Sequence, residues 1–110
     1  MDPDLMLLRL SRSKDLAPFR NFVEPLVRYD RERGSDLVRT LRMYFACGAN
    51  ASEAADKLFL HRNSMLYRLA RIEKLSGADL KNPGAGLILQ LGLLAVEGEE
   101  RRNTDAIEHP

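Results

Sequence analysis

The sequence predicts a small all-α domain, and three observations lead to this prediction. The chain of 110 residues has the length of one domain, and its 45% hydrophobic and 30% charged residues are typical of a folded globular protein. It contains only 7 glycines and 5 prolines, so residues with high helix propensity dominate. Its apolar side chains recur at helical spacing, whereas no segment alternates convincingly with the period of a strand.

Residues 1–34 predict short helical segments that pack on the rest of the domain. The segments cover residues 4–10, 15–23 and 25–33. Pro18 lies in the first turn of the second segment, where a helix tolerates proline. We expect Gly34 to end the third segment, because glycine readily adopts the left-handed conformation that closes a helix.

Residues 35–97 predict the main helical unit, with a helix-turn-helix at its centre. Its first helix begins after Ser35, a good N-cap, and ends at Gly48. The next helix, residues 51–58, is capped by Asn50, and a longer helix spans residues 62–76. An apolar stripe at helical spacing runs along the first of these helices and consists of Leu37, Leu41, Tyr44 and Phe45.

The last predicted helix covers residues 83–97, with Asn82 as its N-cap and Gly98 as its end. The remaining residues, 98–110, are expected to form a solvated tail. This helix is apolar on nearly every side, and a small domain has difficulty burying all sides of one helix. We therefore expect a homodimer that uses this helix, together with the N-terminal segments.

A short helix, a tight break at residues 59–61 and a longer helix have the layout of a DNA-binding helix-turn-helix. Ala55 is small where two helices must cross closely. When residues 62–76 are placed around a helix at 100° per residue, one face is apolar and the opposite face is entirely cationic or hydrogen-bonding. The apolar face consists of Met65, Leu66, Leu69 and Ile72; the opposite face consists of Asn63, Ser64, Tyr67, Arg68, Arg71 and Lys74.

That polar face suits double-stranded DNA. Arginine and asparagine can each form two parallel hydrogen bonds with a purine edge, and base contacts cluster at the start of a recognition helix, which favours Arg62, Asn63 and Ser64. The hydroxyl groups of Ser64 and Tyr67 can donate to phosphate, and Arg71 and Lys74 lie further along, where the DNA backbone is the expected contact.

Other interpretations of these residues remain open. Residues 57–74 carry five basic side chains and one glutamate, a net charge of +4, which could also mark a solvated helix face. Tyr67 could be a partly buried packing residue. His61 could cap the helix or contact phosphate. At the level of function, the alternative to DNA binding is a helical protein-interaction module whose basic helix binds an acidic partner.

Several classes of protein are excluded on composition. One cysteine, Cys47, and two histidines rule out a disulfide framework and make a zinc site improbable. There is no glycine-rich phosphate loop or Ser/His/Asp set, so we predict no enzyme activity and no cofactor. The longest apolar run is too short to cross a membrane, and a cytoplasmic location is expected.

Residues 61–69, His-Arg-Asn-Ser-Met-Leu-Tyr-Arg-Leu, resemble the H-R-N-T-x-x-Y-R-L signature of PucR/CdaR-type bacterial transcription regulators. Further matches lie at residues 29–30, 40–41, 54–58, 71–72 and 75–77. Two departures are Ser64, which replaces the usual threonine but keeps its hydroxyl, and Leu66, at a position that is often polar.

The resemblance implies a C-terminal DNA-binding domain related to the Fis-type helix-turn-helix. In this family the domain usually follows a sensory region in a much longer protein, so the effector is expected to bind a region that is not in this chain. The DNA-facing positions that the resemblance implies are Arg62, Asn63, Ser64, Tyr67 and Arg68.

Overall fold

The computed structural model describes residues 2–108, which fold into α-helices joined by short loops and contain no β-strand. The all-α prediction is therefore confirmed. In chain order the elements are α1 (Pro3–Ser11), the 3-10 turn η1 (Lys14–Leu16), α2 (Ala17–Arg20), α3 (Glu24–Arg33), α4 (Leu37–Ala46), α5 (Ala51–Lys57), α6 (Arg62–Ser76) and α7 (Pro83–Glu108).

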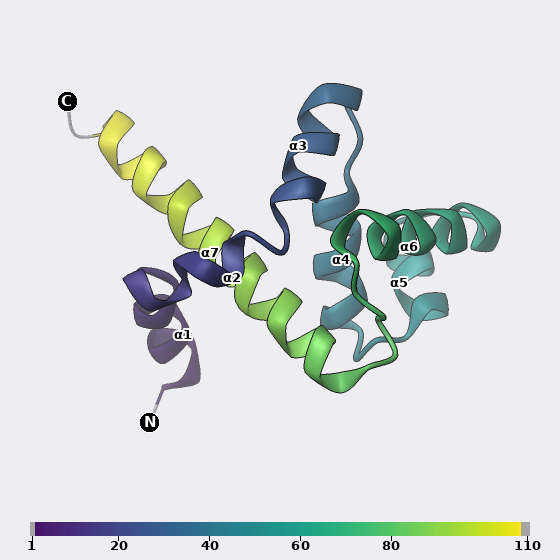
Figure 1. The fold of residues 1–110 in the computed structure, drawn as a ribbon, viewed down its shortest axis with the longest axis horizontal. Coiled ribbons are helices and arrows are strands. Elements are labelled where there is room, and N and C mark those ends of the chain that lie inside the picture. The colour runs from purple at the N-terminus through teal and green to yellow at the C-terminus, as the bar shows by residue number, and fades with distance from the viewer. Residues whose placement is uncertain (1, 109–110) are drawn as a thin grey trace.

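The helices form two groups around the long helix α7 (Figure 1). On one side α1 and α2 pack directly against α7, and on the other side α4 contacts α7 and also α3, α5 and α6. The pair α5 and α6 therefore lies at the far side of the molecule from α1 (Figure 1). This arrangement keeps α1 and α2 away from the outer face of the helix-turn-helix.

One apolar core joins the central helices. Its most deeply buried large side chains, each at most 1% exposed, are Leu26 of α3, Leu41 of α4, Met65 and Ile72 of α6, and Leu89 of α7. Ala54 and Ala55 of α5 are also buried and permit close packing on α6, as the sequence predicts. The core thus holds α6 against α3, α4 and α5 and fixes which of its faces meets solvent.

Most predicted helix ends are confirmed by their hydrogen bonds. The side-chain oxygen of Asn50 accepts from the backbone N–H of Glu53 at 2.9 Å, and that of Asn82 accepts from Ala85 at 3.1 Å. Both arrangements satisfy an N–H that the helix itself leaves unpaired. Gly34 and Gly77 adopt the left-handed conformation directly after α3 and α6, with φ of 62° and 71°.

The prediction that Ser35 caps α4 is wrong. Asp36 takes the N-cap position, and the carboxylate of Asp30, near the end of α3, accepts from the backbone N–H groups of Leu37 at 2.7 Å and Val38 at 3.0 Å. Ser35 instead donates its hydroxyl to Asp30. The cap is supplied by the preceding helix because the turn at residues 34–36 brings the end of α3 beside the start of α4.

The predicted helix at residues 15–23 is not continuous. It divides into η1 and the single turn α2, and the chain then turns at residues 21–23, where the N–H of Val23 donates to the carbonyl of Arg20 at 3.0 Å. Val23 is fully buried at this bend. A bend is required because α2 packs on α7, whereas α3 packs on α4 and α6.

The predicted end of the last helix at residue 97 is also wrong, and residues 109–110 of the expected solvated tail lie outside the described residues. The helix α7 continues through Gly98 to Glu108. A Cβ atom on Gly98 would lie 2.0 Å from the carbonyl oxygen of Ser11, and one on Gly92 would lie 2.6 Å from that of Phe19. These glycines mark the points where the backbones of α1 and α2 approach α7.

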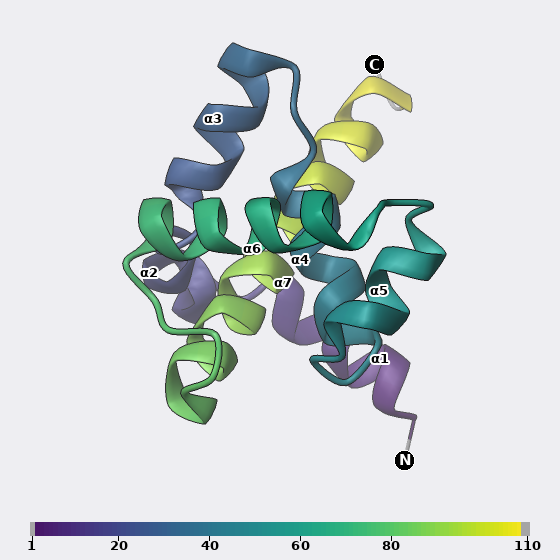
Figure 2. The ribbon, with the colours of Figure 1, turned by 90° about the vertical axis from the view of Figure 1, so that its right-hand side faces the viewer.

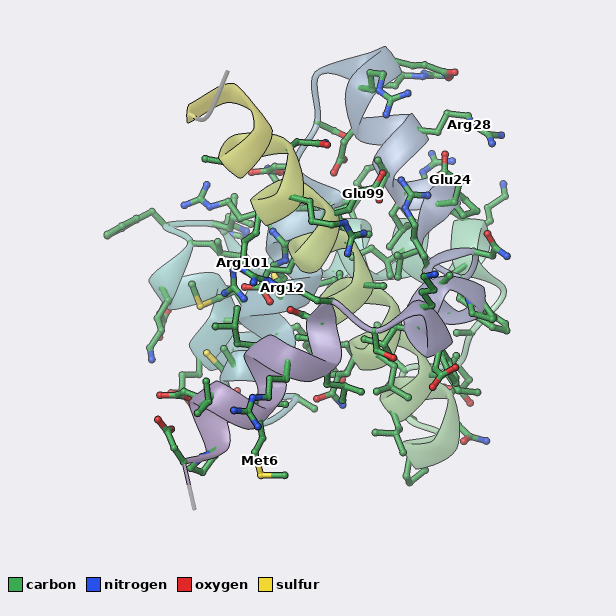
Figure 3. All side chains as sticks on the ribbon, turned by 90° about the vertical axis from the view of Figure 1, so that its left-hand side faces the viewer. Met6, Arg12, Glu24, Arg28, Glu99 and Arg101 are labelled. Carbon is green, nitrogen blue, oxygen red and sulfur yellow. The ribbon has the colours of Figure 1, made fainter. Side chains whose placement is uncertain are left out.

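An ion-pair cluster reinforces this contact. The guanidinium of Arg20 in α2 donates to the carboxylates of Glu99 in α7 and Glu24 in α3. Figure 3 shows Glu24 and Glu99 close together on this side of the molecule. The hydrogen bond to Glu99 is the main cause that raises the pKa of Arg20 above its ordinary value. Three helices are thereby joined through one side chain.

Part of the apolar surface remains exposed. Leu87 of α7 is 58% exposed, and Met6 of α1 is 51% exposed and points away from the body of the molecule (Figure 3). Leu5, Leu7 and Leu10 add to the exposed apolar surface of α1. Among the described residues, no helix combines the length and the apolar character needed to span a membrane.

Candidate nucleic-acid interface

The helix-turn-helix consists of α5, a turn at residues 58–61 and α6. Phe59 makes the turn with a positive φ of 56°, and the N–H of Leu60 donates to the carbonyl of Ala55 at 2.9 Å. His61 then takes the N-cap position of α6, where its Nδ1 accepts from the N–H of Asn63 at 3.1 Å. The interpretation that His61 caps the helix is confirmed. Figure 2 shows α6 lying across the front of the molecule with α5 beside it.

The inner face of α6 is narrower than the sequence predicts. Met65, Leu69 and Ile72 are buried, as expected, but Leu66 is 48% exposed, so its assignment to the core is wrong. Leu66 lies about 60° beyond Leu69 around the helix at 100° per residue. On this side a hollow remains between α5 and α6, and Leu66 forms part of its wall.

The outer face of α6 presents most of the predicted side chains to solvent. Tyr67 is 60% exposed, so the alternative in which it packs into the interior is wrong. The complete outer face lies within the described residues, and it carries no carboxylate. Its exposed polar members are Asn63, Ser64, Tyr67 and Lys74, and Arg62 is exposed beside this face in the first turn.

Glu73, the single acidic residue of α6, forms a hydrogen bond with the loop that follows the helix. Its Oε2 accepts from the backbone N–H of Leu80 at 3.0 Å, in the loop that follows the helix. The carboxylate therefore closes the C-terminal end of α6 and lies away from Asn63 and Ser64 at the start. The positive charges of the outer face are not neutralised from within the helix.

Arg68 differs from its neighbours because its guanidinium is bound within the chain. It forms an ion pair with the carboxylate of Asp36, and it lies 3.2 Å from the hydroxyl oxygen of Thr40. Both partners belong to the start of α4. The structure therefore places Arg68 between α6 and α4, at 27% side-chain exposure, rather than with the exposed residues.

Arg71 is organised by aromatic rings. Its Nη2 donates to the hydroxyl of Tyr67 at 2.9 Å, and its guanidinium carbon lies 5.5 Å from the Tyr67 ring centre and 5.8 Å from that of Tyr29 in α3. The guanidinium carbon of Arg33 lies 5.4 Å from the centre of the Tyr29 ring, so this ring contacts both arginines. The hydrogen bond from Arg71 lowers the pKa of the Tyr67 hydroxyl and raises the pKa of Arg71.

A groove of about 620 Å³ separates α6 from the end of α3 and the loop that follows it. Its only acid is Asp36, which is paired with Arg68. The wall formed by α6 carries the hydrogen-bond donors Asn63, Ser64 and Tyr67 and the cation Arg71, so this wall favours an anionic ligand. The groove is lined by Tyr29, Gly34, Ser35, Asp36, Leu37, Asn63, Ser64, Tyr67, Arg68 and Arg71.

Sequence reasoning did not find Tyr29 and Arg33 as neighbours of this face. They lie on α3, more than 30 residues before α6, and their proximity depends on the packing of α3 against α6. The one available signal was the match at residues 29–30 to the PucR/CdaR pattern. Among the residues whose side chains the structure describes, 2–104, there is also no cluster of three His, Cys, Asp or Glu side chains that could hold a metal ion.

Comparison with known proteins agrees with this geometry. A family described as the PucR C-terminal helix-turn-helix domain matches residues 37–95, which is more than half of the chain. The chain is 36% identical over 87 residues to the purine catabolism regulatory protein of Bacillus subtilis, covering 79% of this chain and 16% of that protein. No solved structure matches the chain well enough to be counted as similar.

Two other relatives from Bacillus subtilis carry regulatory names. The DNA-binding transcriptional activator AdeR is 32% identical over 71 residues, and the proline-responsive transcriptional activator PutR is 29% identical over 68 residues. The matches cover 64% and 62% of this chain but only 17% and 16% of the relatives, so the chain spans about a sixth of their length. The chain belongs to the family of PucR C-terminal helix-turn-helix domains, the DNA-binding domains of transcription regulators.

Proposed function

We propose that the chain binds double-stranded DNA with sequence selectivity and inserts α6 into the major groove. The observation that supports this proposal best is the outer face of α6, which is exposed, cationic or hydrogen-bonding, and free of carboxylates. Duplex DNA is a polyanion whose base edges accept and donate hydrogen bonds, so it matches both properties of this face.

Within this proposal the first turn of α6 reads bases. Arg62, Asn63 and Ser64 are exposed there, and the first turn of a recognition helix is the part that reaches the base edges. Arg62 can form paired hydrogen bonds with guanine, and Asn63 with adenine. Substitution of either residue should therefore change which sequences bind, in addition to how tightly they bind.

The remaining residues contact the DNA backbone or position the helix. Tyr67, Arg71 and Lys74 lie further along α6 and are assigned to phosphates, and the exposed ring of His61 can reach a phosphate beside the start of the helix. Tyr67 restrains the guanidinium of Arg71 before DNA arrives, which lowers the entropy lost on binding. Arg68 is assigned to positioning, because its guanidinium already binds Asp36.

The wider organisation follows from the length of the relatives. The match to residues 37–95 supports a DNA-binding unit at residues 35–97, with the segments 1–34 packed on it. We propose a regulator in the cytoplasm, whose effector binds a sensory region elsewhere in a longer protein. We also propose a homodimer whose interface is formed by the exposed apolar side chains of α1 and by Leu87. Two copies would bind half-sites about one DNA turn apart.

The test begins with selection of bound duplexes from a random pool, followed by affinity measurements over a range of salt concentrations. We expect an enriched sequence and a steep fall of log K with log salt. Arg62→Ala should lose the preference for that sequence, whereas Arg71→Gln should weaken all duplexes and reduce the salt slope by about one. Arg101→Gln is the matched control, since Arg101 lies in α7 on the side shown in Figure 3, away from α6.

The proposal fails if no sequence is enriched, or if both α6 variants bind every duplex as the unmodified chain does. Salt-sensitive binding to an acidic protein, without binding to duplexes, would support the alternative of a protein-interaction module. The homodimer is tested separately by light scattering after size exclusion. A monomer at high protein concentration would contradict it.

A further inference from the structure

Leu66 borders the proposed DNA-binding face, because around α6 it lies between Arg62 and Asn63, about 60° from Asn63 at 100° per residue. It lies in the second turn of α6, one helical turn after Arg62 and one before the exposed Ala70. Its side chain is 48% exposed although it is large and apolar. Its exposed neighbours Arg62, Asn63 and Tyr67 all carry hydrogen-bonding groups, so Leu66 is an apolar side chain beside a polar surface.

The packing of α5 explains why Leu66 remains exposed. A shallow hollow of about 250 Å³ lies between α5 and α6, and Leu66 forms part of its wall. The opposite wall comes from α5 and consists of three small side chains and the carboxylate of Asp56. The hollow is lined by Ala51, Ser52, Ala55, Asp56, Leu60, Arg62, Met65 and Leu66.

We propose that Leu66 contacts the C5-methyl group of a thymine in the major groove and so makes the chain prefer thymine at one position of its binding site. This inference rests on the proposed insertion of α6 into that groove. The methyl group of thymine is the apolar feature of the major-groove base edges, and an aliphatic side chain there recognises it by excluding water. A leucine forms no hydrogen bond with phosphate or with a polar base edge.

The position of the thymine follows from the geometry of the helix. Leu66 lies three residues after Asn63, which is about 4.5 Å along the helix axis at 1.5 Å per residue. Successive bases on one strand are about 3.4 Å apart. The thymine contacted by Leu66 therefore lies one or two base steps from the base that Asn63 reads.

The experiment removes the methyl group and the leucine side chain independently. Each thymine of the selected duplex is replaced in turn by deoxyuridine, which differs from thymidine only in lacking the C5-methyl group. The affinity of the 110-residue chain should fall about fourfold at one position near the Asn63 site and change little elsewhere, as expected for one buried methyl group. Leu66→Ala should bind the thymine and deoxyuridine duplexes equally at that position.

Two further variants separate recognition from folding. Leu66→Met keeps an apolar side chain of similar length and should keep most of the preference for thymine. Phe22→Ala removes an apolar side chain of similar exposure, 47%, from the bend at residues 21–23 and should leave the fourfold difference unchanged. Thermal unfolding of Leu66→Ala checks that the variant is folded before its affinity is measured.

The inference is overturned if no thymine replacement changes the affinity, or if the difference persists in Leu66→Ala. Either result would leave the proposed function intact, because a sequence would still have been selected. If no duplex is selected at all, the proposed function fails and the role of Leu66 fails with it. An effect of Leu66→Ala on binding to a protein partner alone would also contradict the inference.

Discussion

Arg68 in α6 and Asp36 at the start of α4 form an ion pair between two helices that are not consecutive in the chain. The guanidinium of Arg68 also donates to Thr40, one turn further along α4. Because Asp30 supplies the cap of α4, the carboxylate of Asp36 is available for this contact. The pair therefore fixes the rotation of α6 relative to α4, and with it the face that α6 presents.

Replacing Arg68 with methionine should lower the free energy of unfolding by about 1 kcal/mol, since the pair is partly exposed and such pairs contribute little. DNA affinity should fall for all sequences while the preferred sequence stays the same. Urea denaturation and binding to the selected duplex measure the two effects. Arg39→Met is the matched control, because Arg39 approaches the same carboxylate only at 3.6 Å and is 66% exposed.

A double-mutant cycle with Asp36→Asn tests the assignment to positioning. The two substitutions should be less destabilising together than the sum of their separate effects, because each one breaks the same contact. Strict additivity would contradict the role of this pair. A change in the preferred sequence on Arg68→Met would instead indicate that Arg68 contacts a base.

Local signals explain what could be predicted from the sequence. Asn50, Asn82, Gly34 and Gly77 act within one or two residues of a helix end, so their side chains or backbone preferences define that end without help from the rest of the fold. The buried positions of α6 follow from the 3.6-residue repeat, and three of the four assigned to the core are buried.

Contacts between distant segments account for the errors. Gly98, like Gly77, follows a predicted helix, yet it lies inside α7. A glycine is needed there because the carbonyl oxygen of Ser11 occupies the space that a Cβ would fill. Asp30 caps a helix that begins seven residues later. Leu66 is exposed because α5 and α6 leave a hollow beside it. Each outcome depends on which segments meet in space, and neither periodicity nor propensity contains that information.

Gly98→Ala should lower the free energy of unfolding by about 1–3 kcal/mol, the usual range for overpacking. The added Cβ would lie 2.0 Å from a backbone oxygen, so α1 or α7 must shift. Gly86→Ala is the control, since its Cβ would lie 3.6 Å from the ring of Phe45, an ordinary contact. That substitution should be neutral or should stabilise the helix by up to about 1 kcal/mol.

Urea denaturation of both variants measures this difference. If Gly98→Ala were as stable as Gly86→Ala, the close approach of α1 to α7 would be wrong. Helix α7 would then need no glycine at this point.

Phe59 should be better replaced by glycine than by alanine. Its φ of 56° is left-handed, a conformation that costs a residue with a Cβ about 1–2 kcal/mol, and its ring is 95% exposed and adds little to the core. Phe59→Gly should therefore be more stable than Phe59→Ala by about 1 kcal/mol. Thermal unfolding of the two variants measures the difference.

The same pair of substitutions at Lys57 provides the control. Lys57 is the last residue of α5 and has right-handed helical backbone, so there alanine should be more stable than glycine by up to about 1 kcal/mol. The more stable of the two variants should thus be alanine at position 57 and glycine at position 59. The same order at both positions would show that the turn does not hold Phe59 in the left-handed conformation.

Tyr67 should ionise at a lower pH than Tyr44, because the hydrogen bond from Arg71 lowers the pKa of Tyr67 whereas burial raises that of Tyr44. Absorbance of tyrosinate during an alkaline titration measures both. Tyr67→Phe should remove the signal that rises below the ordinary pKa of 10.0, and Arg71→Gln should move that signal toward 10.0. Tyr44→Phe is the control, and it should remove only the signal that rises above pH 10.0.

The direction of the pKa shift of Tyr67 also predicts how DNA binding depends on pH. A tyrosinate on the outer face of α6 would repel phosphate, so affinity should weaken as the pH rises toward 10.0. Bound DNA disfavours the ionised form, so the pKa of Tyr67 should be higher in the complex than in the free chain. Tyr67→Phe should flatten this pH dependence, and an unchanged profile would show that Tyr67 lies away from the DNA.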